Sequence, residues 1–332
     1  MAIYLVTGGA GFIGSHIVEE LVHLLPAPHQ FIGSHIVEEL VRRGEQVRVL
    51  DNFSTGKREN LTPLLGEIEL IEGDMRSYHI VREAVQGTDY VLHQGALPSV
   101  PRSINDPITT KDVNVGGTLN ILDAARDAGV KRVVYASSSS VYGANKALPK
   151  QEDMMPQPIS PYAVAKLTGE KYCHVFSRTY GLETVALRYF NVFGPRQDPQ
   201  SAYAAFIPKF IVGMMEGQSL TIDGDGSQSR DFTYVSNVVR GNLLAVEAEG
   251  VSGEMFNMAC GSSMSLNEIV EHLRRLLGCE GDISYGPPRA GDVPMSLADI
   301  GRAREGLGYE PEISVGEGLE KVVAWFKERK GE

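Results

Sequence analysis

The chain has 332 residues, which is too long for one small domain and fits one large domain or two interlocked ones. It carries 31 basic and 42 acidic residues, for a formal net charge of −11. A chain this acidic gains nothing from releasing counterions on nucleic acid, and an anionic membrane surface would repel it. We therefore expect neither nucleic acid nor a membrane as its partner.

The opening residues and the cysteines indicate a cytoplasmic protein. Met1–Thr7 lacks the basic segment of a signal peptide, and no apolar run is long enough to span a membrane. The three cysteines, Cys173, Cys260 and Cys279, have neither a metal-binding nor a redox spacing. We expect no metal site and no disulfide.

The first half of the chain alternates apolar runs with helical segments, which is typical of buried parallel strands joined by helices. This rhythm predicts an α/β fold, a Rossmann-type doubly wound parallel sheet over residues 1–190. A smaller substrate-binding lobe, residues 191–332, is expected to be interleaved with it, because the segment 233–260 contains a strand-like run that can return to the sheet. The predicted strands are Ile3–Val6, Val47–Leu50, Ile68–Ile71, Tyr90–His93, Val133–Ser137, Thr184–Tyr189 and Phe256–Ala259.

A repeat interrupts this pattern near the N-terminus. Residues 12–22 recur without change as residues 31–41, and the segment 23–30 joins the two copies. Two copies do not make a solenoid. We interpret them as a tandem duplication of one helix.

Glycines after the first strand indicate a dinucleotide site. Gly8–Gly14 reads G-G-A-G-F-I-G and opens a helix, so its backbone can approach a pyrophosphate that faces the helix N-terminus. Asp51 ends the next strand, where a carboxylate can bind the adenosine ribose and would repel the extra phosphate of NADP. It lies 37 residues after Gly14, and 18 once the 19-residue duplication is discounted. We therefore expect NAD as cofactor.

The residues expected to bind NAD follow this pattern. Asp74 and Met75 come after the third strand, where they either contact the adenine or cap a loop. The set from this part of the chain is Gly8, Gly11, Phe12, Ile13, Gly14, Asp51, Asn52, Asp74 and Met75.

Only one copy of the repeat can occupy the helix position beside the first strand. The first copy continues directly from the glycine turn, whereas the second joins the next strand without interruption. Because a surface insertion costs little loop entropy, we give more weight to the glycine turn. We predict that Phe12–Leu21 forms the phosphate-binding helix and that the second copy forms a helix outside the nucleotide-binding core.

Ser160–Lys166 begins a helix, with serine as N-cap and proline at the first position. Tyr162 and Lys166 lie four residues apart, on one helix face. A phenol ionises near pH 10 unless a cation helps, and Lys166 with the positive nicotinamide ring would stabilise the phenolate. A serine hydroxyl from the run Ser137–Ser140 would hold the phenol oxygen while Tyr162 acts as general base.

These motifs together resemble the extended short-chain dehydrogenase/reductase superfamily, and closely the UDP-glucose/UDP-N-acetylglucosamine 4-epimerases. The resemblance runs from Met1 nearly to the C-terminus, outside the inserted repeat. The matching segments are Thr7–His16, Asp51–Gly56, His93–Pro107, Ser137–Gly143, Ser160–Lys166, Leu187–Gln197 and Arg289–Asp299.

The resemblance implies roles for further residues. The catalytic set becomes Ser138, Tyr162 and Lys166, with Asn114 and Tyr189 on the cofactor side together with Tyr162 and Lys166. Two arginines converging on a dianionic diphosphate also make chemical sense without the family. The residues matched to the UDP-sugar are Ser139, Ser140, Asn191, Arg230, Arg289, Asp292 and Ser296.

The implied reaction is that of an isomerase: oxidation at C4, rotation of the 4-keto sugar, and return of hydride to the other face. Dehydratase relatives need an added acid/base pair after the catalytic serine, where this chain has Ser139 and Ser140. Ser296 stands where a tyrosine would crowd the C2 substituent, so an N-acetyl group should fit. Pro98 departs from the glycine of some N-acetyl-specific relatives, so exclusive N-acetyl specificity is not implied.

Several alternatives stay open at this point. A uronate epimerase, a dehydratase or a reductase would share most of these residues, and a non-catalytic protein would follow if the duplication had spoiled the cofactor site. We also expect a homodimer, because relatives pair the helix that continues through Tyr172, Val175 and Phe176 with the helix Gly117–Ala128 in an intersubunit bundle.

Overall fold

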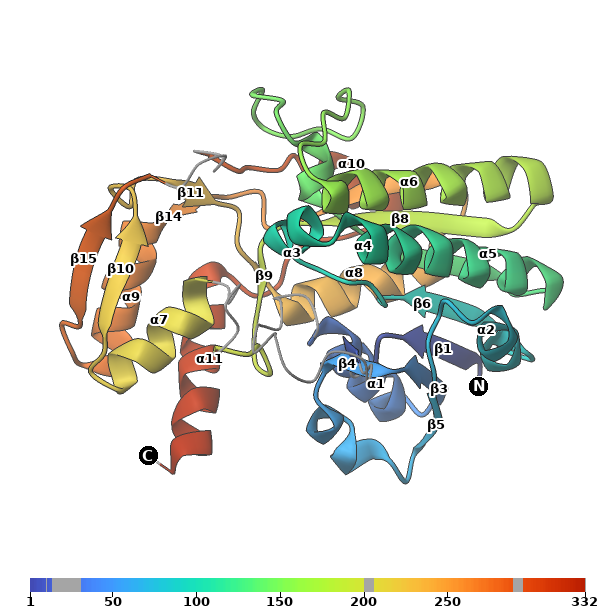
Figure 1. The fold of residues 1–332 in the computed structure, drawn as a ribbon, viewed down its shortest axis with the longest axis horizontal. Coiled ribbons are helices and arrows are strands. Elements are labelled where there is room, and N and C mark those ends of the chain that lie inside the picture. Colours follow the sequence, from blue (N-terminus) through green and yellow to red (C-terminus); the bar gives the residue numbers. More distant parts are fainter. Residues whose placement is uncertain (10, 14–30, 200–205, 289–294, 332) are drawn as a thin grey trace.

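The computed structural model describes residues 1–9, 11–13, 31–199, 206–288 and 295–331. Its centre is a seven-stranded parallel sheet in the order β13-β8-β7-β6-β1-β3-β5 (Figure 1). This confirms the predicted α/β fold with a doubly wound parallel sheet. The strands are β1 (Ile3–Thr7), β3 (Gln46–Asp51), β5 (Ile68–Glu72), β6 (Tyr90–His93), β7 (Arg132–Ser138), β8 (Glu183–Tyr189) and β13 (Glu254–Met258).

Helices cover both faces of this sheet, which explains why its strands are nearly continuous apolar runs. On one face, α1 (Ile32–Arg42) and α8 (Val235–Glu247) pack on side chains such as Val6, Leu92 and Val134. On the other face, α2 (Tyr78–Val85), α5 (Thr118–Asp127) and α6 (Pro161–Val175) pack on Leu5 and Val91. The two apolar layers fix the carboxyl ends of the strands at one edge.

After β8, some segments of the chain return to the main sheet and the others form a smaller lobe. β13 pairs in parallel with β8, so this part of the chain lies in the main sheet. The lobe holds two short strand pairs with the helices around them (Figure 1). Its elements are α7 (Phe206–Met215), β10 (Ser219–Asp223), β11 (Ser229–Arg230), β14 (Met264–Ser265), α9 (Leu266–Leu277), β15 (Asp282–Gly286) and α11 (Val315–Lys330).

Short elements connect the sheet with this lobe and shape the edge between them. β9 (Val192–Phe193) pairs with β12 (Thr233–Tyr234), and α10 (Gly301–Leu307) packs near β13. The remaining short elements are β2 (Gly11–Ile13), β4 (Phe53–Gly56), α3 (Val100–Asn105), α4 (Pro107–Lys111), the π-helical turns Asp112–Gly117 and Phe176–Tyr180, and the 3-10 turns Arg58–Asn60, Thr62–Leu64 and Ser139–Tyr142. No described helix has the length and apolar character needed to cross a membrane.

The prediction for the duplicated helix is wrong. The second copy, not the first, forms the helix beside β1, and the side chains expected to lack a sheet partner (Ile32, Ile36, Val37 and Leu40) are at most 1% exposed in the main core. Of the first copy, residues 12 and 13 belong to β2, which pairs antiparallel with β4, and residues 14–22 lie outside the described residues. Continuity with Arg42, Arg43 and β3 outweighs continuity with the glycine turn.

Candidate active site

Helix α6 begins next to the carboxyl end of β7 and carries the two predicted proton-transfer residues. The hydroxyl of Ser160 accepts a hydrogen bond from the backbone N–H of Ala163 (3.2 Å), and Pro161 occupies the first helical position. Tyr162 and Lys166 follow one turn apart, and both are buried. A capped helix start therefore holds both side chains at the strand edge.

Burial disfavours the charged forms of both side chains. The ammonium of Lys166 donates to the backbone carbonyl of Ala136 (2.7 Å) and lies 5.9 Å from the centre of the Tyr162 ring. Burial lowers the pKa of Lys166 to about 7, with Glu170 acting in the opposite direction. Burial raises the pKa of Tyr162 well above its usual value, and a hydrogen bond with Ser138 opposes that rise. The structure thus brings Ser138, Tyr162 and Lys166 together.

The serine run turns sharply at the end of β7. The hydroxyl of Ser138 accepts from the backbone N–H of Ser140 (3.2 Å) and from its hydroxyl (3.0 Å), which begins the turn Ser139–Tyr142. Ser139 and Ser140 are half-buried. The hydroxyls of Ser138 and Ser140 therefore lie together at this turn, and the Ser138 hydroxyl reaches Tyr162.

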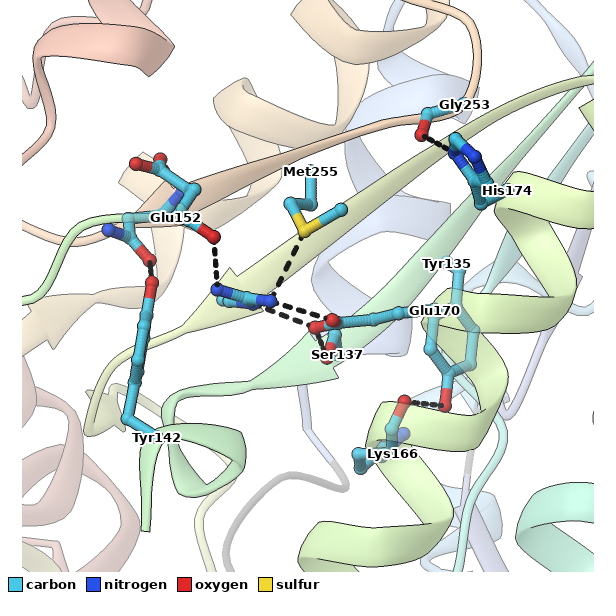
Figure 2. Close-up of polar contacts among 11 residues, drawn as sticks. Tyr135, Ser137, Tyr142, Glu152, Lys166, Glu170, His174, Gly253 and Met255 are labelled. Carbon is cyan, nitrogen blue, oxygen red and sulfur yellow. Dashed lines mark hydrogen bonds and ion pairs between the residues drawn. The ribbon is translucent and has the colours of Figure 1, made fainter. Parts of the chain in front are cut away.

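A buried ion pair fixes α6 against β7 and β8, and sequence reasoning missed it. The carboxylate of Glu170 accepts from the Ser137 hydroxyl (2.5 Å) and from two nitrogens of Arg188 (2.8 Å each). Figure 2 shows the Glu170 carboxylate beside the Ser137 hydroxyl, with Lys166 farther along the same helix. The signal in the sequence is Glu170 itself, placed four residues after Lys166 and so one turn along the same helix face. Glu170 and Arg188 are therefore positioning residues, because they hold α6 in place rather than line the cavity.

A cavity opens beside Tyr162 and continues toward the end of β3. Its two parts share Gly8, Thr55, Gly95 and Ala96. The part near Tyr162 is lined by Gly8, Ile32, Thr55, Gln94, Gly95, Ala96, Pro98, Ala136, Ser137, Tyr162, Lys166 and Tyr189. The other part is lined by Thr7, Gly8, Leu50, Asp51, Asn52, Ser54, Thr55, Gly73, Asp74, Met75, Gly95, Ala96, Leu97 and Val113. Together they run from the Tyr162 side chain to the Asp51 carboxylate.

Two glycines let backbone segments meet at the head of this cavity. Gly8 has a φ of +71°, and a side chain there would come within 2.7 Å of the Gly95 Cα. A side chain at Gly33 would come within 2.3 Å of the Gly8 carbonyl oxygen. Gly33 therefore occupies the place that the sequence reasoning assigned to Gly14, which lies outside the described residues. Gly11 lies in β2 and pairs with Gly56.

The predicted ribose and adenine ligands gather at the end of β3. Asp51 is 4% exposed, and its carboxylate accepts from the backbone N–H of Phe53 (2.7 Å). The amide of Asn52 donates to the Asp74 carboxylate (3.0 Å). Burial works against ionisation of Asp74, but hydrogen bonds from Arg76 lower its pKa overall. Met75, which is buried, lines the same part of the cavity.

Asn114 and Tyr189, which the resemblance assigns to the cofactor side, hydrogen-bond to the segment that follows β6. The Asn114 side chain bonds the Leu97 N–H (2.6 Å) and the Leu97 carbonyl (2.8 Å), so it holds the loop after β6. The Tyr189 hydroxyl donates to Gln94 (3.0 Å) and lies 3.1 Å from the Asn242 side-chain oxygen. Tyr189 lines the cavity, whereas Asn114 supports its wall.

The predicted sugar-nucleotide ligands meet where β11 approaches the sheet edge. The side-chain amide of Asn191 donates to the Asp231 carbonyl (3.1 Å), and the Ser296 N–H donates to the Ser229 carbonyl (3.0 Å). Arg230 lies between these two contacts in sequence and is half-buried. Arg289 and Asp292 lie outside the described residues. Asn191 and Ser296 thus both contact the stretch 229–231, which contains Arg230.

The doubly wound sheet and the tyrosine–lysine pair at its carboxyl edge define an extended short-chain dehydrogenase/reductase. Residues 29–259 match the NAD dependent epimerase/dehydratase family. The chain is also 38% identical to the putative UDP-glucose 4-epimerase of Methanocaldococcus jannaschii, over 97% of this chain and 98% of that one. The chain therefore belongs to the NAD dependent epimerase/dehydratase family. The match begins at residue 29, so it contains the second copy of the repeat and not the first.

Other relatives and solved structures share the whole fold. A UDP-glucuronate 4-epimerase of Thermodesulfobacterium geofontis is 34% identical over 98% of this chain and 97% of that one. The UDP-glucose 4-epimerase of Thermotoga maritima, solved with UDP-glucose, has a TM-score of 0.88 at 37% identity and 99% coverage of both chains. The UDP-N-acetylglucosamine 4-epimerase of Methanobrevibacter ruminantium, solved with UDP-N-acetylmuramic acid, has a TM-score of 0.89 at 38% identity and the same coverage.

Proposed function

We propose that this chain is a UDP-sugar 4-epimerase that uses NAD and acts on the glucose and N-acetylglucosamine series. The observation that carries the proposal is the grouping of Ser138 with Tyr162 and Lys166, the last two of which line the cavity. None of the described residues that line the Tyr162 part of the cavity has a carboxylate. A dehydratase would need an added acid/base pair there, so plain epimerisation is favoured.

The described residues fit NAD. Glycines at positions 8 and 33 leave a backbone-lined space that a side chain would fill, as a pyrophosphate site requires. The Asp51 carboxylate, at the end of β3, would bind the adenosine ribose hydroxyls and exclude a 2′-phosphate. Bound NAD would supply the reversible hydride acceptance that the reaction needs.

The side chains of this protein would move and hold the proton. The Tyr162 oxygen would take the proton of the sugar 4-hydroxyl and later return it. Its raised pKa means that the phenol stays protonated unless positive charge is close, and the Lys166 ammonium lies 5.9 Å from the centre of the ring. The Ser138 hydroxyl would hold the reacting oxygens in line.

The residues matched to the UDP-sugar favour the glucose and N-acetylglucosamine series as substrates. Ser296 is small and half-buried, which leaves room beside the C2 position for an N-acetyl group. Asn191 and Arg230 would hold the diphosphate. A uronate series is the second candidate, because a UDP-glucuronate 4-epimerase matches the chain over nearly its whole length.

Proton NMR of the sugar products tests this proposal directly. We expect the purified protein to invert C4 of UDP-galactose and of UDP-N-acetylgalactosamine without net consumption of NAD. Inversion of UDP-galacturonate alone would move the assignment to the uronate series. No inversion of any of the three would refute the function. Tyr162→Phe serves as the inactive control.

We further propose a cytoplasmic homodimer that pairs through α5 and α6. The described structure pairs none of the three cysteines, which suits a reducing compartment. Val164 and Val175 of α6 are 50% and 46% exposed, so this helix presents apolar side chains to solvent. Phe176, by contrast, is buried in the chain's own core.

A further inference from the structure

We infer that Asp231 is a positioning residue of the proposed sugar-nucleotide site. It ties together the three chain segments that carry Asn191, Arg230 and Ser296. Asp231 comes directly after β11, which Figure 1 shows in the smaller lobe. The inference deepens the proposed function and rests on it, because these three residues are the described members of the set matched to the UDP-sugar.

The Asp231 carboxylate is fully buried and accepts hydrogen bonds from three backbone N–H groups. One oxygen accepts from Cys260 (2.9 Å), and the other accepts from Gly261 (3.1 Å) and Ala298 (3.2 Å). Cys260 and Gly261 come just after β13 of the main sheet, whereas Ala298 belongs to the segment that leads into α10. One side chain therefore joins the edge of the sheet to a segment that comes much later in the chain.

The backbone around this carboxylate contacts the segments of the other two predicted ligands. The Asp231 carbonyl accepts from the side-chain amide of Asn191 (3.1 Å), whose φ of +33° is strained for a residue other than glycine. The Ser229 carbonyl accepts from the N–H of Ser296 (3.0 Å). Arg230 lies between these two contacts in sequence. The position of all three predicted ligands therefore depends on how residues 229–231 are held.

The Asp231 carboxylate is costly to bury. Burial raises the pKa of Asp231 to about 7 and the three hydrogen bonds oppose this rise, with no contribution from a described cation. Hydrogen bonds from N–H groups to a charged oxygen are strong, and leaving a buried N–H group without its acceptor costs free energy. A hydrophobic side chain would often stabilise such a place as well or better. We therefore assign the carboxylate to holding one geometry of the site.

The segment 295–299 is anchored independently on its other side. The N–H of Lys150 donates to the Leu297 carbonyl (2.8 Å), and the Lys150 carbonyl accepts from the N–H of Asp299 (2.9 Å). Those bonds hold the segment to the loop of Lys150, whereas its distance from β11 depends on the Asp231 carboxylate and one backbone hydrogen bond. Weakening the carboxylate contact should therefore shift the segment relative to β11 without detaching it.

Asp231→Asn tests this role with little change of shape. An amide offers one oxygen where the carboxylate offers two, and it has no charge, so at least one of the three N–H groups loses its acceptor. The matched control is Arg132→Met. Arg132 is also buried, and its guanidinium donates to three backbone carbonyls at the end of α8. It is the first residue of β7, whereas Ser138 is the last, so the control lies at the opposite edge of the sheet from the site.

Binding and turnover measurements should separate the two variants. We expect Asp231→Asn to raise the dissociation constant of UDP and the KM of UDP-galactose about tenfold, because Arg230 is no longer held against the segment of Ser296. The kcat should fall by about twofold at most, since the three catalytic residues are untouched. Arg132→Met should lower the melting temperature and leave both constants unchanged. Unchanged constants in Asp231→Asn, or an equal change in Arg132→Met, would overturn the inference.

Hydrogen exchange of the same variants distinguishes this inference from the proposed function. The backbone N–H groups of residues 296–298 should exchange faster in Asp231→Asn, whereas Arg132→Met should exchange faster around residues 245–248. If the wild type binds no UDP although this difference appears, the proposed function fails while the coupling of the segment to Asp231 stands. If exchange over residues 296–298 is unchanged in Asp231→Asn, the positioning role is refuted even where UDP binding weakens.

Discussion

Removing one copy of the repeat should stabilise the protein. Deleting residues 12–30 or residues 23–41 yields the same sequence, with Gly11 directly before a single copy of the helix. The connection between Gly9 and the helix falls from 21 residues to 2. Loop closure scales as about (3/2)RT ln n, so this shortening contributes about 2 kcal/mol to the free energy of unfolding.

One interaction of the longer chain is lost on deletion. Gly11 pairs with Gly56 and Ile13 with Phe53 across β2 and β4, and each backbone hydrogen bond contributes about 1 kcal/mol net. The net gain is therefore at most about 1 kcal/mol, which raises the melting temperature by roughly 1–2 °C for a chain of 332 residues. The deletion should also keep the activity, because it restores the usual glycine spacing.

Thermal and urea unfolding of the two proteins, with and without NAD, measure these effects. We expect a higher urea midpoint at unchanged slope, since the buried surface of the core stays the same. The stabilisation by saturating NAD should be larger in the shortened protein. A lower melting temperature, or loss of NAD binding on deletion, would show that residues 12–30 contribute to the fold more than their loop entropy costs.

Four further perturbations test the site and the assembly. Tyr162→Phe should abolish epimerisation while NAD binding and melting temperature stay near wild type; wild-type rates would rule out Tyr162 as the base. Ser296→Tyr should suppress turnover of UDP-N-acetylgalactosamine far more than that of UDP-galactose, and equal losses would contradict the C2-pocket assignment. His93 is buried between Thr7 and Thr118, and burial lowers its pKa to about 3. The unfolded chain then binds a proton that the fold does not, so stability present above pH 6.5 falls by about 2 kcal/mol at pH 5. Urea unfolding at pH 7.5 and pH 5 measures this, and His93→Asn should lower the stability difference between the two pH values by about 2 kcal/mol, while His35, whose pKa burial also lowers to about 3, keeps its own share. Light scattering at micromolar concentration should give a dimer mass, and a monomer would refute the α5–α6 interface.

The strands of the sheet could be predicted because they are buried on both faces. Val47–Leu50 and Tyr90–His93 read as short, mainly apolar runs. In the structure they lie in β3 and β6, which pair in parallel with β1 on its two sides. Tyr162 and Lys166 were predictable for a similar reason, since a helix of known start fixes which residues share a face. Both inferences needed only local periodicity.

The ion pair between Glu170 and Arg188 could not be predicted in this way. Each residue alone reads as an ordinary surface charge, and their meeting depends on how α6 packs across β7 and β8. The duplicated helix was predictable only in part, because two identical segments carry the same local signals. The decision between them depends on flanking residues, and the direct junction of residues 31–41 with β3 outweighs the glycine turn.

The ion pair affects the chemistry because it keeps the Glu170 carboxylate from bonding Lys166. Glu170 lies one turn from Lys166 on α6, and its charge raises the pKa of the Lys166 ammonium against the effect of burial. A carboxylate with free oxygens at that distance would attract the ammonium away from Tyr162. Arg188 and Ser137 occupy those oxygens, so Lys166 bonds the Ala136 carbonyl instead. The charge of Glu170 thus supports protonation of Lys166 without binding it, which leaves the ammonium beside the phenol that must ionise.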